Sequence, residues 1–187
     1  MDLTPERERD LLQLARERIE EKIFDRPSPA WERLKGEPWL AEKSGLFVTL
    51  KKDGDLRGCI GAIVGERPLG DTVRDMAIQS AFFDPRFPPV EAEELPEIEI
   101  ELSLLTPLAP VDSWRDIVIG RDGMLLSYRG RQALFLPQVA PEQGWDLETT
   151  LTHLARKAGL PAEIWREPDC RFKTFRAIVF GEKEPRR

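Results

Sequence analysis

A cysteine stands beside an arginine in the hexamer LRGCIG, Leu56 to Gly61, the first place where this sequence suggests chemistry. In a regular strand, Arg57 and Cys59 would share one face, while Leu56 and Ile60 would turn toward the core. A nearby cation favours the thiolate over the thiol, which is how many reactive cysteines are made. The pattern therefore predicts either a functional thiol or a buried structural cysteine with Arg57 in a fixed ion pair.

Two glycines, Gly58 and Gly61, interrupt the same strand. Glycine weakens the interior of a strand and often marks a bulge, or a site that another backbone or a ligand approaches closely. Both glycines are therefore candidate binding residues, because they leave space beside the thiol.

A second cluster, SAFFDPRFPPV, places Asp84 and Arg86 on a stiff connector after a helix. Pro85 keeps Asp84 away from helical angles, and the prolines that follow restrict the chain further. Rigid loops that carry charge often bind ligands. The alternative is a salt bridge that only fixes the loop.

The polar face of the alternating stretch Ile98 to Leu104 carries Glu101 and Ser103. If this face lines a cleft, Glu101 is a candidate base or an ion-pair partner for Arg57. His153, the single histidine, lies opposite the apolar stripe of its helix and is interpreted as a surface residue rather than a partner for Cys59. No metal site is predicted, because Cys59 and Cys170 stand outside any C-x-x-C pattern.

The elements that position these residues follow from hydrophobic periodicity and turn chemistry. Asp53-Gly54 between two strand-like runs predicts a β-hairpin. The helix expected near Leu69 to Phe83 is apolar on two faces, which is typical of a helix between two layers. The order of elements predicts an α+β fold with a mainly antiparallel sheet packed with helices. Helices are expected over residues 4–24, 69–83 and 146–158, and strands over 46–51, 56–63, 98–104, 117–119, 124–128, 133–136 and 171–180.

The length and the net charge of the chain indicate which classes of protein and partner are compatible with this sequence. A chain of 187 residues with a formal net charge of -6 fits a globular protein and makes nucleic acid an unlikely partner. No segment has the features of a signal peptide or a membrane span, so we expect a cytoplasmic protein without membrane contact. The tail over residues 182–187 is predicted to fray.

Five ordered motifs, LRGCIG, SAFFDPRFPPV, IEIELSLLTP, ALFLPQV and LARKAGLP, resemble those of the AMMECR domain family. The resemblance covers nearly the whole chain. It implies a single domain over residues 1–187, built as a larger and a smaller lobe with a cleft between them. It marks as family residues Arg57, Gly58, Cys59, Gly61, Asp84, Arg86, Phe87, Glu101, Ser103, Pro137 and Gln138.

The family has no established activity, and the resemblance implies no cofactor, so the cofactor stays unknown. Members of this size resemble the A component of a three-part bacterial and archaeal system. Its other members look like a Memo-type protein and a radical S-adenosylmethionine enzyme, which makes both candidate partners. A small-molecule ligand and a homo-oligomer are also compatible with the sequence.

Two functional hypotheses follow. In the first, the protein is an enzyme or enzyme component for a small anionic substrate. Arg57 and Arg86 would bind the anion, Cys59 would act as nucleophile or redox thiol, and Glu101 or Asp84 would move protons. In the second, the protein is a non-catalytic adaptor that binds a partner protein or peptide, and an exposed apolar patch beside the motif is expected.

Overall fold

The structure is a computed structural model that describes residues 3–183. The chain forms two compact units, one containing the chain up to Leu105 and again from Ile178, the other spanning Thr106–Ala177. Residues 184–187 of the predicted tail lie outside the described part. The cleft expected between two lobes stays a prediction.

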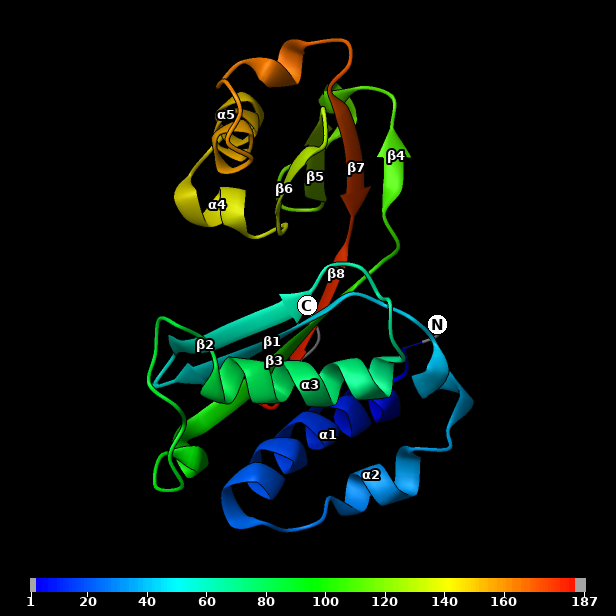
Figure 1. The fold of residues 1–187 in the computed structure, drawn as a ribbon, viewed down its shortest axis with the longest axis vertical. Helices are drawn as coiled ribbons and strands as arrows, with labels where there is room; N and C mark the ends of the chain where they lie inside the picture. Colours follow the sequence, from blue (N-terminus) through cyan, green and yellow to red (C-terminus); the bar gives the residue numbers. More distant parts are fainter. Residues whose placement is uncertain (1–2, 184–187) are drawn as a thin grey trace. The chain divides into compact units, whose positions relative to one another are not determined.

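The first unit is a four-stranded sheet covered by helices on one face (Figure 1). The strand order is β2-β1-β3-β8, so β2 is an edge strand. The elements are α1 (Pro5–Phe24), α2 (Pro29–Leu34), a 3-10 turn η1 (Pro38–Ala41), β1 (Leu46–Lys52), β2 (Asp55–Ala62), α3 (Leu69–Phe82), η2 (Leu95–Glu97), β3 (Ile98–Leu105) and β8 (Ala177–Gly181).

The helices of this unit begin and pack as their sequences predict. The Thr4 hydroxyl accepts a hydrogen bond from the Arg7 N–H, and Pro5 occupies the first turn of α1. Helix α3 contacts α1 on one side and strands β1 and β2 on the other, which confirms a helix between two layers. Leu46, Val48 and Leu50 are fully buried against these helices. The alternate residues of β1 therefore face away from the helices, on what we call the open face of the sheet.

The predicted hairpin is confirmed, and it contains a β-bulge, one of the two features that the glycines of this strand were expected to mark. Asp53 and Gly54 both have positive φ angles, as a tight hairpin turn requires. Lys51 lies opposite Leu56, but Leu50 lies opposite Gly58, so Arg57 is an extra residue in β2. A bulge of this kind breaks the alternation of side chains between the two faces of a strand.

The carboxyl end of the described chain is held by hydrogen bonds and an ion pair. The Glu182 carboxylate accepts hydrogen bonds from Arg16 and from the Ile100 N–H, the latter at 2.8 Å. Lys183 forms an ion pair with Glu99. Residues 182 and 183 are therefore bonded to the first unit, and fraying of the tail stays a prediction.

The second unit has its own four-stranded sheet, in the order β4-β7-β5-β6, and its own core. The Asp146 carboxylate accepts the Thr149 N–H and caps α5, and Gly159 with φ 70° follows the end of this helix. The core contains Met124, Leu126, Leu151, Leu154 and Trp165, all fully or almost fully buried. The elements are β4 (Ala109–Val111), η3 (Trp114–Asp116), β5 (Gly123–Tyr128), β6 (Arg131–Phe135), α4 (Val139–Gln143), α5 (Leu147–Lys157), η4 (Ile164–Arg166) and β7 (Arg171–Phe175).

The α+β class with antiparallel sheets is confirmed, and three strand predictions need correction. Residues 117–119 form no strand, because the buried Asp122 carboxylate accepts the Val118 N–H and shapes a loop instead. The last strand breaks at Arg176, whose N–H donates to the Thr106 hydroxyl, so β7 and β8 belong to different sheets. Strand β4 was not predicted. No helix in residues 3–183 has the length and apolarity that crossing a bilayer demands.

Candidate functional site

Cys59 lies in a row of three residues that crosses the open face of the first sheet. Thr49 of β1 is directly opposite Cys59 of β2 on one side and Glu101 of β3 on the other. The Cys59 sulfur is 3.3 Å from the Thr49 hydroxyl oxygen, and the thiol is only partly buried. The Lys51 ammonium donates to Glu101 at 2.8 Å. The open face thus combines a thiol, a hydroxyl and an ion pair.

The prediction that Leu56 packs inward is wrong. Its side chain is 45% exposed and lies opposite Lys51, on the open face that Cys59 also occupies. The bulge at Arg57 is the cause, because it shifts the register by one residue between Leu56 and Gly58. The same bulge breaks the strand alternation from which Arg57 and Cys59 were expected to share a face.

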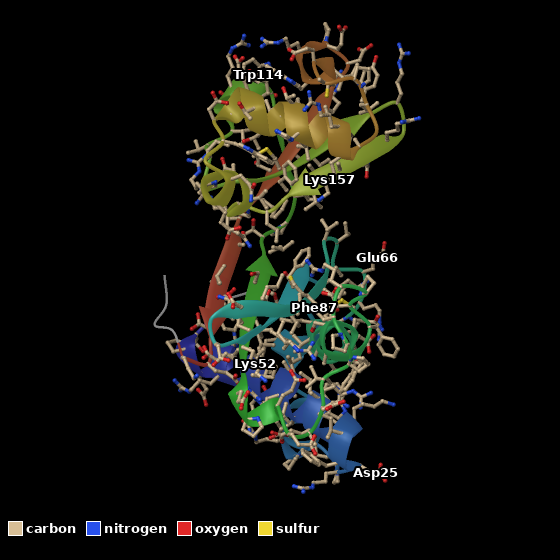
Figure 2. All side chains as sticks on the ribbon, turned by 90° about the vertical axis from the view of Figure 1, so that its left-hand side faces the viewer. Asp25, Lys52, Glu66, Phe87, Trp114 and Lys157 are labelled. Carbon is tan, nitrogen blue, oxygen red and sulfur yellow. The ribbon has the colours of Figure 1, made fainter. Side chains whose placement is uncertain are left out.

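Arg57 turns instead toward the loop after α3, where Glu94 binds it. Its Nε and Nη2 donate to the two Glu94 carboxylate oxygens at 2.7 and 3.1 Å. The Arg57 guanidinium holds the pKa of Glu94 below its usual range. The expected ion pair is therefore present, but with Glu94 rather than Glu101. Phe87, labelled in Figure 2, places its ring 6.0 Å from the Arg57 guanidinium.

Asp84 and Arg86 brace the outer edge of β2 at Cys59. The Asp84 carboxylate accepts the Cys59 N–H at 2.9 Å, and Arg86 Nη2 donates to the Cys59 carbonyl at 3.3 Å. Because β2 is an edge strand, these backbone groups have no neighbouring strand to pair with. The two side chains therefore form the hydrogen bonds to the Cys59 backbone that a further strand would otherwise form. We call this pair, with its bonds to Cys59, the edge brace.

The edge brace is held together by strong internal bonds. Arg86 donates through Nε and Nη2 to Asp84 at 2.9 and 2.6 Å, and its backbone N–H adds a third bond. The Arg86 guanidinium and the Cys59 N–H hold the pKa of the buried Asp84 far below its usual range. Arg86 is thus committed to Asp84, although 53% of its side chain is exposed.

The two glycines of the hexamer make room for neighbouring parts of the protein. A Cβ at Gly58 would lie 2.3 Å from the Ser80 carbonyl oxygen of α3, and one at Gly61 would lie 2.3 Å from the Phe47 ring. Ser80 is itself buried, and its hydroxyl donates to the Met76 carbonyl. Both glycines therefore have a packing explanation in this structure.

The remaining predicted residues lie apart from the thiol or have another environment. Ser103 lies on the open face but is buried, with 3% exposure. Gln138 belongs to the second unit and directly precedes α4. Its backbone carbonyl accepts a hydrogen bond from the Glu142 N–H of that helix. His153 is also in the second unit and stacks on Trp145, with ring centroids 4.0 Å apart.

Sequence reasoning missed Thr49, Lys51 and Glu94 as neighbours of the predicted residues. The alternation of Leu46 to Leu50 would have placed Thr49 on the open face. Only the register of the bulged hairpin, however, sets Thr49 opposite Cys59. Within residues 3–183, no three or more His, Cys, Asp or Glu side chains are grouped so as to hold a metal ion.

Exposed apolar side chains concentrate along the same hairpin strand. The structure exposes six large apolar residues in its described part; one lies in β2, two directly follow β2, and one directly precedes Asp84. Leu56 lies within β2, Ile63 and Val64 follow it, and Phe83 precedes the edge brace. Phe83 is the most exposed of them, at 60%.

This two-sheet α+β architecture, with a braced LRGCIG strand at a sheet edge, defines the class of the protein. The chain belongs to the AMMECR1 family, whose sequence model matches residues 12–180. A protein from Methanopyrus kandleri is 47% identical over 155 residues, covering 78% of this chain and 75% of the relative. A protein from Thermococcus kodakarensis is 41% identical over 195 residues, covering 94% of this chain and 90% of the relative.

The crystal structure of the uncharacterized protein PH0010 from Pyrococcus horikoshii is similar throughout. It superimposes with a TM-score of 0.80 at 37% sequence identity, over 95% of this chain and 94% of the other. The family resemblance inferred from the five motifs is therefore confirmed.

Proposed function

We propose that this protein is a non-catalytic binding component, an adaptor that holds a partner protein at strand β2 and the edge brace. One observation carries the proposal: of the six large exposed apolar residues in the described chain, one lies in β2, two directly follow it and one directly precedes Asp84 of the edge brace. Scattered apolar residues are normal on a protein surface, but a concentration beside one motif is typical of an interaction site.

The residue types around the edge brace support the same function. Phe87 lies beneath two arginines, with the Arg86 guanidinium 5.4 Å and the Arg57 guanidinium 6.0 Å from its ring. Aromatic residues and arginine are enriched in the centres of protein interfaces. Glu94 and Asp84 are paired with the two arginines, so a partner surface would not need to neutralise them.

The resemblance described above supplies two candidate partners, the Memo-type protein and the radical S-adenosylmethionine protein. Asp53 and Asp55 are exposed at the Leu56 end of the hairpin. A complementary partner surface would therefore be basic there, and association would slow as salt is added.

The test is direct binding between purified proteins, followed by hydrogen–deuterium exchange on the complex. We expect one of the two candidates to bind and to slow exchange in residues 55–64 and 83–87. Protection confined to other segments, or no binding to either protein, would overturn the adaptor.

The second candidate function is an enzyme component that uses the Cys59 thiol. The partly exposed sulfur 3.3 Å from the Thr49 hydroxyl favours it. Glu101 would accept the thiol proton, but it lies two strands away, about 10 Å across the sheet. The proton would have to pass through the Thr49 hydroxyl, and the Glu101 carboxylate is already paired with Lys51.

Alkylation separates this candidate from the adaptor. A nucleophilic Cys59 would react with iodoacetamide at pH 7 faster than a free cysteine in an unstructured peptide, measured by mass spectrometry. Cys170 is the internal control, because burial raises its pKa to about 11 and leaves the thiol neutral. Slow labelling of Cys59, together with full cellular function of a Cys59→Ser variant, would exclude thiol chemistry.

A further inference from the structure

The second unit contains a pocket that plays no part in the function proposed above. It has a volume of about 160 Å³ and is lined by residues 111–115, 165–168 and 170–172. Trp114, labelled in Figure 2, packs its ring edge-on against Trp165 at 4.8 Å and joins the two turns η3 and η4. The pocket therefore lies where these turns meet the paired ends of β4 and β7.

Three buried residues among those lining the pocket are apolar in character. Trp165, Phe172 and Cys170 are 1%, 6% and 8% exposed. Burial raises the pKa of Cys170 to about 11, so its thiol stays neutral and behaves as a small apolar group. These three residues suit an apolar part of a ligand rather than a charge.

Two arginines of the lining have no carboxylate partner among the described residues. Arg115 lies over the Trp114 ring at 4.2 Å, and Arg171 donates one bond to the Pro168 carbonyl at 3.0 Å. Arg166, by contrast, is already paired with Glu148 and Glu163. Arg115 and Arg171 can therefore still bind an incoming carboxylate.

Two carboxylates of the same lining, Asp112 and Glu167, likewise have no cationic partner within the described chain. Single unpaired charges on a surface are ordinary. Here, unpaired charges of both signs border one concavity together with buried apolar residues. A simple anion would use only half of these groups.

We propose that this pocket binds a small zwitterion with an apolar side chain, a free α-amino acid in chemical class. The ligand carboxylate would bind Arg115 or Arg171, its ammonium would bind Asp112 or Glu167, and its side chain would contact the half-buried Trp114 and the exposed part of Phe172. Ligand sites of this kind typically combine an apolar lining with a few polar groups that fix orientation.

The experiment titrates the full chain with L-leucine, N-acetyl-L-leucine and L-leucinamide, followed by calorimetry and by the indole N–H signals in NMR spectra. L-Leucine is expected to saturate and to shift the signals of Trp114 and Trp165. Each derivative lacks one of the two charges and is expected to bind about 10-fold more weakly or worse.

Matched variants test the assigned groups. Arg171→Gln and Asp112→Asn are expected to weaken L-leucine binding about 10-fold, whereas Arg156→Gln and Glu142→Gln, exposed residues outside the pocket, should leave it unchanged. Lack of saturation at millimolar L-leucine, unmoved indole signals, or binding of either derivative as tight as that of L-leucine would overturn the proposal. The result is independent of partner binding at β2.

Discussion

Asp84 is the residue on which the hallmark strand depends most. Its buried carboxylate accepts hydrogen bonds from the Cys59 N–H and the Arg86 N–H and is paired with the Arg86 guanidinium. Removing one member of such a pair leaves the others without their partner, which is costly even when the intact pair adds little net stability. Asp84 therefore fixes the position of Cys59 whichever of the two functions is correct.

An Asp84→Asn variant is expected to lose about 3 kcal/mol in the free energy of unfolding at pH 7, measured by urea denaturation. The exposed Asp55→Asn is the control and should change stability little. An Asp84→Asn variant as stable as the unaltered protein would show that the edge brace does not hold β2.

The pH dependence of stability should change in the same variant. The pKa of Asp84 is lower in the folded state than in the unfolded state, where it is about 3.9. The ionised Asp84 therefore contributes fully to the free energy of unfolding above that pH, and this contribution is lost as the pH falls below it. As the pH is lowered from 5, the free energy of unfolding should therefore fall more steeply for the unaltered protein than for Asp84→Asn. Urea denaturation repeated at a series of pH values measures this difference. If the free energies of unfolding of the two proteins changed with pH in parallel, the lowered pKa of Asp84 in the folded state would be contradicted.

At the scale of elements, the packing of α3 on β2 depends on a missing side chain. A methyl group at Gly58 would meet the backbone of α3, which cannot move aside as a flexible side chain would. We expect Gly58→Ala to destabilise the protein by about 2 kcal/mol in urea denaturation, as overpacked cores do.

Gly36→Ala is the matched control, because no atom lies within 4 Å of the Cβ it would add. It should be neutral or slightly stabilising. If Gly58→Ala were equally neutral, the close approach of α3 would not be what requires glycine at this position.

The elements were more predictable from sequence than the site. Helix α1 with its Thr4 cap, the Asp53-Gly54 hairpin and the alternating strand β3 follow from local patterns, and each is present. The glycines of the hexamer allow for a bulge, but they do not place it at Arg57, because its position depends on how two strands pair. The bulge reversed the expected direction of Leu56, and Arg57 pairs with Glu94 instead of joining Cys59. Contacts between distant segments, such as Asp84 with Cys59, could not be predicted. The sequence shows that Asp84 is a charged residue in a rigid loop, but not which group it binds.

At the scale of the whole molecule, the negative charge is concentrated in one unit. Residues 106–177 contain 10 basic and 9 acidic side chains, whereas the rest of the chain contains 18 basic and 25 acidic ones. The unit that carries LRGCIG therefore presents a negative field to a partner. Raising the salt concentration should lower the association rate more than the dissociation rate, measured by surface binding kinetics.

The most direct test of the adaptor is the effect of Phe83→Ser on the equilibrium dissociation constant for the candidate partner that binds. Phe83 is 60% exposed, so its replacement should leave the fold intact. Val118→Ser is the control, because Val118 is also exposed, at 44%, but lies in the other unit. We predict that Phe83→Ser weakens binding about 10-fold or more, as removal of a central aromatic residue does, and that Val118→Ser has no effect. Equal dissociation constants for Phe83→Ser and the unaltered protein would contradict the account.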